Sequence, residues 1–280
     1  MEKIKMNFLL KYYLDLTGTD HLHWGLWREG DPLDLEHLQA AQERYADHLL
    51  GLIPSDVTNV LDVGCGVGGI ARKLEERGYR VTALAPDPYQ QKQFRKRTGG
   101  RIPFVLSRFE DYAPEASFDL ILMSESVQYL PLAESFAKAR ELLRPGGYLL
   151  TSDCYRLDSS RGSGAFLPYH FLTEFLGAAR PYGFELLDNH DISEAVLPTL
   201  QYGQMIFSRY IRPTLRMPLL ALKVHVPILY RTLRFGLRRS VKGRRLRDML
   251  RDRLTPLSPE VFQSHVRYVV HLFRITPGPG

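Results

Sequence analysis

Apolar and polar positions along the central part of this chain alternate between two periods. Short apolar runs are typical of strands covered on both faces, and the segments between them repeat apolar residues every three or four positions, as amphipathic helices do. The predicted strands are 60–63, 79–85, 103–106, 118–123, 148–152, 184–188 and 266–275. The predicted helices are 34–52, 70–76, 88–97, 132–143 and 169–179. Repeated units of this kind predict an α/β fold with a doubly wound, mostly parallel sheet of seven strands.

The order of these elements predicts four segments. Residues 1–56 form an N-terminal helical region, and residues 57–190 carry the first six strands. Residues 191–262 form a helical insertion, and residues 263–280 supply the last strand and a tail. The sheet is therefore expected to close with a strand that follows an inserted helical segment.

Charge is spread unevenly along the 280 residues. Hydrophobic residues make up 44% and charged residues 24%, which is ordinary for a folded protein. Residues 209–253 contain 14 Lys and Arg against Asp248 and Asp252, so this segment carries +12 while the whole chain carries +6. The high isoelectric point comes from the insertion alone.

Other features set the expected compartment. Cys65 and Cys154 are far apart, which argues against a disulfide framework or a cysteine metal site. The N-terminus lacks the apolar core and cleavage site of a signal peptide. No stretch reaches the roughly 18 uninterrupted apolar residues of a membrane span. We expect a cytoplasmic protein that could contact a membrane peripherally.

A glycine-rich turn follows the first strand, in the sequence VLDVGCGVGG at residues 60–69. A strand that turns through glycines into a helix brings bare backbone N–H groups close to a ligand. The spacing of Gly64, Gly66 and Gly68 is close to the dinucleotide fingerprint, so NAD(P) or FAD is one alternative and a turn without a ligand another. Cys65 fits as a small residue beside the ligand.

The pattern hydrophobic-Asp-hydrophobic-Gly-x-Gly-x-Gly resembles the first motif of the class I S-adenosylmethionine (SAM)-dependent methyltransferases. Residues 118–121 (FDLI) resemble the fourth strand of that family, and residues 142–149 (LLRPGGYL) its turn before strand five. The resemblance covers residues 59–154. It implies a Rossmann-like fold, SAM as cofactor and S-adenosylhomocysteine as product. The cofactor-binding residues that it implies in this motif are Asp62, Gly64, Cys65, Gly66 and Gly68.

The second strand departs from the family pattern. Most members end it with an acidic residue that holds the ribose of SAM, and Ala85 stands there. Residues 83–90 resemble the branch with cyclopropane-fatty-acid synthases and tocopherol-type methyltransferases. This resemblance implies that Asp87 and Gln90 bind the ribose, while the alternative is that Asp87 only caps the following helix.

The adenine region departs as well. Many members carry Asp where this chain has Arg108, which cannot accept a hydrogen bond from the adenine amino group. Phe109 offers an apolar face for the ring, with Glu110 nearby. The alternative for Phe109 is ordinary packing in the core.

The loop after the fourth strand is expected to face both SAM and the methyl acceptor, because the carboxyl ends of such strands line the ligand crevice. Ser124 is predicted beside the cofactor. Glu125 is a candidate to orient the acceptor or take its proton, and Tyr129 to pack near the sulfonium. The alternative for Glu125 is a solvated loop carboxylate. His170 is a further candidate for acceptor binding.

The aromatic segment 12–27 resembles the lid of small-molecule methyltransferases. Dense aromatic residues exclude water and face a sulfonium. Tyr13 and Trp24 are predicted to contact the acceptor. His23 is a candidate general base, although a lid without direct chemistry is the favoured interpretation. His21 and His23 have no partner ligand nearby in the sequence, so no metal site is predicted.

The insertion contains a basic amphipathic pattern, with Leu229, Leu233, Leu237 and Val241 every four residues and Arg or Lys between them. It begins with residues 191–198, which resemble tocopherol- and sterol-type methyltransferases. Such a helix can pack on the core with a solvated basic face, or contact an anionic membrane through residues 228–253. Nucleic acid is a weaker alternative, because no RNA-binding module accompanies the patch.

The leading hypothesis is a SAM-dependent methyltransferase that acts on a small, apolar acceptor such as a lipid or isoprenoid. Two alternatives stay open. One is an RNA-directed methyltransferase that uses the basic insertion. The other is a methyltransferase-like binding module that has lost SAM, which Ala85 and Arg108 favour.

Overall fold

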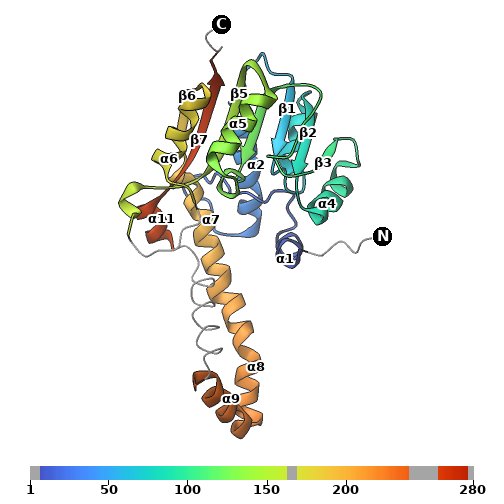
Figure 1. The fold of residues 1–280 in the computed structure, drawn as a ribbon. Helices are drawn as coiled ribbons and strands as arrows, with labels where there is room; N and C mark the ends of the chain where they lie inside the picture. Colours follow the sequence, from blue (N-terminus) through green and yellow to red (C-terminus); the bar gives the residue numbers. More distant parts are fainter. Residues whose placement is uncertain (1–6, 163–168, 240–257, 277–280) are drawn as a thin grey trace.

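The computed structural model describes residues 7–162, 169–239 and 258–276. Its centre is a seven-stranded sheet in the order β3-β2-β1-β4-β5-β7-β6 (Figure 1). The strands are β1 Asn59–Val63, β2 Arg80–Ala85, β3 Phe104–Leu106, β4 Phe118–Ser124, β5 Leu143–Arg156, β6 Phe184–Asp191 and β7 Val266–Ile275. β1 to β5 pair in parallel, and β7 runs antiparallel to β5 and β6. The predicted fold class is confirmed.

Helices cover both faces of the sheet. The α-helices are α1 Phe8–Thr17, α2 Leu35–Gly51, α3 Gly69–Glu76, α4 Pro88–Thr98, α5 Leu132–Leu142, α6 Leu172–Ala179, α7 Ser193–Ile206, α8 Arg212–His225, α9 Pro227–Arg239 and α11 Pro259–His265. Short 3-10 turns are η1 Val127–Tyr129, η2 Asp158–Ser160 and η3 Arg180–Tyr182, and the π-helical turn η4 Phe207–Ile211 joins α7 to α8. One core contains α2, α3, α4, α7 and α11, and the other contains α5 and α6. Alternate strand residues therefore enter opposite cores, as Val60 and Leu61 do.

Capping residues explain where two helices begin. The side chain of Asp34 accepts a hydrogen bond from the backbone N–H of His37 at the start of α2. Asp87 does the same for the N–H groups of Tyr89 and Gln90 at the start of α4, where Pro88 is the first residue. The predicted cap at Asp87 is confirmed.

The predicted start of the fifth strand at residue 148 is wrong. β5 begins at Leu143, which pairs with Phe118, and the register shifts before Leu120 pairs with Tyr148. The Pro-Gly-Gly segment is therefore an irregularity within the strand rather than a turn outside it. β6 likewise extends to Asp191 through a register shift, and α6 begins three residues later than predicted.

The N-terminal region and the insertion are attached to the body in different ways. α2 buries Tyr45, Leu49 and Leu50 in the core of the sheet. α7 leaves the body, and η4, α8 and α9 extend it as an arm (Figure 1). Residues 240–253 of the predicted basic helix lie outside the described residues. No helix of the described chain is long and apolar enough to cross a membrane.

Candidate functional site

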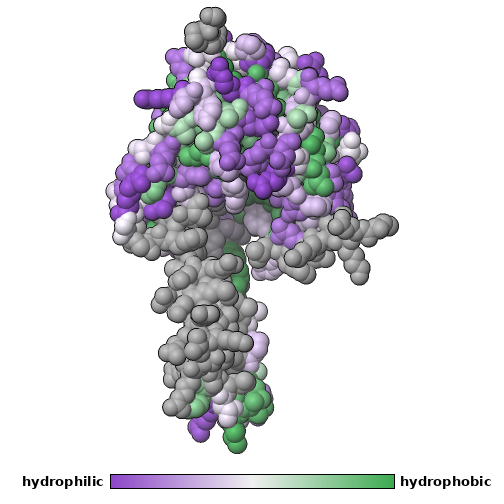
Figure 2. Space-filling model, viewed as in Figure 1, coloured by the Kyte–Doolittle hydropathy of each residue, from purple (hydrophilic) through white to green (hydrophobic). Residues whose placement is uncertain are grey.

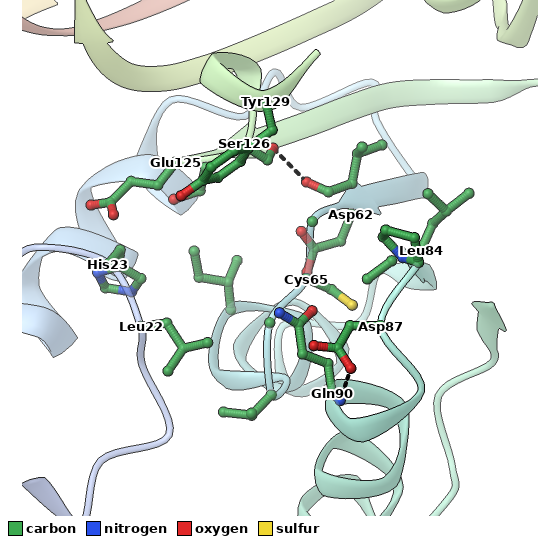
Figure 3. Close-up of a pocket in the computed structure, with 18 of the residues that line it drawn as sticks. Leu22, His23, Asp62, Cys65, Leu84, Asp87, Gln90, Glu125, Ser126 and Tyr129 are labelled. Carbon is green, nitrogen blue, oxygen red and sulfur yellow. Dashed lines mark hydrogen bonds between the residues drawn. The ribbon is translucent and has the colours of Figure 1, made fainter. Parts of the chain in front are cut away.

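A cavity of about 600 Å³ lies between the carboxyl ends of β1, β2 and β4 and the segment that carries Leu22 and His23 (Figure 3). Asp62 and Cys65 border its middle, Asp87 and Gln90 one end, and Glu125 the end nearest His23. The predicted site residues that line it are His23, Asp62, Gly64, Cys65, Gly66, Asp87, Gln90, Phe109, Glu110, Ser124, Glu125 and Tyr129.

The glycine turn forms the floor of the cavity. Gly64, Gly66 and Gly68 all have positive φ values, of 77°, 56° and 101°. A Cβ atom at Gly64 would overlap the Cβ of Ser126, whose hydroxyl donates to the carbonyl of Val63 at 2.7 Å. The turn therefore needs glycine for both its backbone conformation and its close approach to the loop after β4.

Asp62 presents an unpartnered carboxylate oxygen at this floor. The residue is 2% exposed, and its Oδ2 has no hydrogen-bond partner among the described residues. Burial raises the pKa of Asp62 to about 7. A buried oxygen without a partner is costly unless a ligand satisfies it. The ammonium group of SAM supplies a matching donor and charge, so the residues present fit this cofactor.

The other end of the cavity combines structural and candidate binding roles. Oδ1 of Asp87 caps α4, and its Oδ2 accepts a hydrogen bond from Nδ2 of Asn7 at 3.2 Å. Asp87 nevertheless lines the cavity beside Gln90. Phe109 is 2% exposed and belongs to the core, so it both packs and borders the cavity. Arg108 forms an ion pair with Glu110 at 3.2 Å, which ties up the carboxylate predicted near adenine.

Glu125 is held in an unusual conformation at the lid end. Among the described residues it is the only one other than glycine with a positive φ, 53°. Its Oε1 accepts hydrogen bonds from the backbone N–H of Trp24 and the hydroxyl of Tyr268, both at 2.6 Å. Burial raises the pKa of Glu125 to about 7, although these two bonds favour the ionised form. A positive φ at a residue other than glycine persists only where the surrounding structure enforces it. The two hydrogen bonds show that Glu125 is not a freely solvated carboxylate.

Two tyrosines that the sequence analysis missed support Glu125. The hydroxyl of Tyr268 lies 3.0 Å from that of Tyr45, which lies 2.9 Å from Oγ of Ser124 and 2.8 Å from Oγ of Ser152. Tyr45 lies in the buried stripe of α2, and Tyr268 lies among the apolar residues of β7. Both sequence patterns therefore indicate only packing. The tyrosine hydroxyl groups could have indicated a polar network, because a buried tyrosine hydroxyl needs a hydrogen-bond partner.

The two histidines of the N-terminal segment bond to one another and to neighbouring protein groups. Nδ1 of His23 faces the carbonyl of Trp24 at 2.8 Å, and its Nε2 faces Nδ1 of His21 at 2.9 Å. Nε2 of His21 lies 2.9 Å from Glu43. Burial lowers the pKa of His23 well below its usual value. Because all four ring nitrogens are engaged, the geometry favours a lid element over a general base or a metal ligand.

Some predicted contact residues do not line the cavity. The hydroxyl of Tyr13 accepts a hydrogen bond from Gln42, the ring of Trp24 packs near Phe262 and Tyr268, and Nε2 of His170 faces the carbonyl of Leu130. All three side chains therefore contact other protein groups and do not face the cavity. Gly68 also lies outside the lining and is the N-cap residue of α3, which begins at Gly69. Cys65 does line it, but burial raises the pKa of its thiol, so it is no activated nucleophile.

Comparisons with known proteins identify relatives of this chain. Residues 61–151 match the family model described as "Methyltransferase domain". The sterol 24-C-methyltransferase ERG6B of Gibberella zeae is 32% identical over 177 residues, which are 55% of this chain and 46% of that protein. The 2-methyl-6-phytyl-1,4-hydroquinone methyltransferase of Synechocystis sp. is 34% identical over 170 residues, which are 54% and 48%. The chain thus spans about half the length of these relatives.

A solved structure extends the similarity to the whole fold. The crystal structure of the cyclase SpnF superposes with a TM-score of 0.68 and covers 97% of this chain and 93% of its own, at 18% identity. Identity this low supports the fold and leaves the reaction to other observations. The family model and the two relatives identify residues 61–151 as part of a SAM-dependent methyltransferase domain.

Proposed function

We propose that this protein transfers a methyl group from SAM to a small, apolar acceptor, with Glu125 as the residue that receives the acceptor's proton. The observation that carries the proposal is the position of Glu125, a carboxyl with a pKa of about 7 at the lid end of the cavity. Bound SAM supplies a methyl group already activated on a sulfonium. The chain then has to position the acceptor, exclude water and accept a proton.

Each of these tasks has candidate residues. Asp62 and the turn at Gly64 and Gly66 would hold the amino-acid part of the cofactor, and Asp87 with Gln90 the ribose. Both hydrogen bonds to Glu125 end on Oε1, and among the described residues Oε2 has no partner. This oxygen is therefore left to receive a proton from a hydroxyl or carbon acceptor. Tyr129 also lines the cavity and would pack near the reacting centre.

An apolar acceptor is supported by the relatives and by the lid. The names of the two relatives give a sterol and a phytyl hydroquinone as their acceptors, and both are mostly apolar small molecules. In this chain, Leu22 and Tyr129 border the cavity beside Glu125. A mostly apolar site with a few placed polar groups is typical for such ligands.

The test uses the full chain with methyl-labelled SAM and an extract of its source cells. We expect label in a product that partitions into organic solvent, and loss of that label in the Glu125→Gln variant. Label confined to RNA or protein would contradict the apolar acceptor.

Two alternatives keep specific support. The 12 Lys and Arg between residues 195 and 247, with no Asp or Glu, favour an RNA substrate. Ala85 and Arg108 favour a role other than methyl transfer. Calorimetry separates the last alternative, since a module that has lost SAM predicts no micromolar binding of SAM or S-adenosylhomocysteine.

A further inference from the structure

The arm formed by η4, α8 and α9 exposes apolar side chains to an unusual degree. Met217, Leu220 and Val224 are 65%, 52% and 71% exposed, and Ile228 at the start of α9 is 76% exposed. In Figure 2 the far end of the arm shows hydrophobic side chains beside hydrophilic ones. The distal surface is defined here as Met217, Leu220, Val224, Val226, Ile228 and Leu229. Exposed apolar side chains that gather on one part of a protein mark an interaction site.

Basic side chains lie beside the apolar ones on α8. Met217, Leu220 and Val224 are three and four residues apart, which places them on one face of the helix. Arg212, Arg216 and Lys223 have the same kind of spacing about one quarter of a turn away. Among the described residues, no carboxylate forms an ion pair with these three cations. The sequence from Ala195 to Arg247 contains no acidic residue.

We propose that the distal surface inserts into the boundary of an anionic lipid bilayer, with the basic face of α8 on the headgroups. An apolar face flanked by long basic side chains is the arrangement by which helices lie in the membrane interface. Each Lys or Arg near an anionic surface adds attraction.

Other partners match only half of these observations. Nucleic acid would neutralise Arg212, Arg216 and Lys223 through phosphates but would leave Val224 and Ile228 in water. A second copy of the arm would cover the apolar residues but would bring the two basic faces together. An anionic bilayer accommodates both the apolar and the basic face.

The base of the arm is bonded to the lid. The N–H of Trp27 donates to the carbonyl of Ala195 in α7 at 2.8 Å. The hydroxyl of Thr199 accepts hydrogen bonds from the N–H of Gly25 at 3.0 Å and from Nε1 of Trp27 at 2.8 Å. A docked arm would therefore fix the lid, and the cavity below it, relative to the membrane surface.

The test is cosedimentation of the full chain with vesicles of phosphatidylcholine alone or mixed with phosphatidylglycerol. No SAM or acceptor is added, so the result does not depend on the proposed methyl transfer. We expect binding to the mixed vesicles only. The double variant Val224→Ser/Ile228→Ser should weaken it roughly tenfold or more, since two apolar side chains lose their burial. Arg212→Gln/Arg216→Gln should weaken it by about fivefold for each charge removed and reduce its salt dependence.

Matched controls lie on the body. Leu187→Ser removes an apolar residue of β6 that is 48% exposed, and Arg101→Gln removes an exposed charge; neither should change binding. Unchanged affinity for S-adenosylhomocysteine in all variants would show that they fold. Protein that stays in the supernatant with mixed vesicles would overturn the proposal. Two other results would also overturn it. One is a dimer that dissociates in the Val224→Ser/Ile228→Ser variant. The other is a protein that binds no lipid but binds RNA, with the same affinity in this variant.

Discussion

The backbone N–H of Trp24 lies 2.6 Å from Oε1 of Glu125, so the lid is bonded directly to the carboxyl at the end of the cavity. The two residues are 101 positions apart in the sequence. The same carboxylate oxygen accepts a hydrogen bond from the hydroxyl of Tyr268 in the last strand. The N-terminal segment and the last strand therefore hold the carboxyl of Glu125 together.

Glu125→Gln should lower kcat for methyl transfer by roughly 100-fold or more, because glutamine keeps the shape of the side chain but does not accept a proton as a base. The affinity for S-adenosylhomocysteine should change little, since Asp62 and the glycine turn lie elsewhere in the cavity. Initial rates with labelled SAM and calorimetric titration measure the two effects. Glu134→Gln, an exposed carboxylate in the first turn of α5, is the control. Equal losses of rate and of affinity would argue that Glu125 is structural.

Tyr268→Phe should move the acidic limb of the pH–rate profile to higher pH. The Tyr268 hydroxyl donates to Oε1 of Glu125 and favours its ionised form, so its loss raises the pKa of Glu125 above its value of about 7. A hydrogen bond to a charged group corresponds to a shift of roughly one pH unit. Tyr155→Phe removes a buried tyrosine hydroxyl from the opposite core and should leave the profile in place. A lower rate at every pH with an unshifted profile would contradict the positioning role.

The sequence predicts the local parts of this fold well and the long-range parts of the site poorly. The last strand has the predicted bounds, 266–275, because apolar, aromatic and β-branched residues fill all of its positions except Arg267, His271 and Arg274. The start of β5 escapes prediction because Leu143 joins the sheet by pairing with Phe118, across a Pro-Gly-Gly segment that locally indicates a turn.

The support of Glu125 escapes for a related reason. Tyr45 and Tyr268 are 223 residues apart, and each lies in a pattern that packing alone explains. The bond from Trp24 comes from its backbone, so the identity of its side chain carries no information about it. The periodicity of the insertion indicates amphipathic helices, yet only the fold shows that the apolar face of α8 is exposed beyond the body.

Asp62→Asn should stabilise the cofactor-free protein while it weakens cofactor binding. The pKa of Asp62 is raised from 3.8 to about 7, so its contribution to stability is present below pH 4 and lost as the pH rises through about 7. The variant lacks this loss, and its advantage in unfolding free energy should grow over that range to at most about 4 kcal/mol. Affinity for S-adenosylhomocysteine should fall roughly 10- to 100-fold, because the ammonium group loses its charged partner.

Urea unfolding between pH 4 and 8, with calorimetry at pH 8, measures both effects of this change. Asp119→Asn is a contrasting control. Asp119 accepts hydrogen bonds from Thr58 and Asn59 and pairs with Arg144, and its pKa is lowered to about 2. This substitution should destabilise the protein without a specific effect on the cofactor. An Asp62→Asn variant with unchanged affinity for S-adenosylhomocysteine would contradict the assignment of Asp62 to the ammonium group.

His271→Phe should remove one part of the protein's sensitivity to acid. His271 lies in β7 among the rings of Tyr155, Phe175 and Phe273, is 1% exposed, and has no partner for Nδ1 among the described residues. Burial lowers its pKa from 6.5 to about 4. Between these two pH values His271 binds a proton in the unfolded chain but not in the folded chain. The stability of the fold therefore falls as the pH drops from about 6.5 to about 4. This shift corresponds to about 3 kcal/mol.

The measurement for His271→Phe is the difference in unfolding free energy between variant and unmodified protein, at intervals from pH 7 to 4. This difference isolates His271, because Glu125 and Asp153, whose raised pKa values of about 7 and about 8 act in the opposite direction, are present in both proteins. We expect the variant to gain relative stability steadily below pH 6.5. His37→Phe is the control, since Asp34 raises the pKa of that exposed histidine and its loss should not relieve acid sensitivity. A constant difference for His271→Phe across the range would mean that His271 takes up its proton in the folded state without cost.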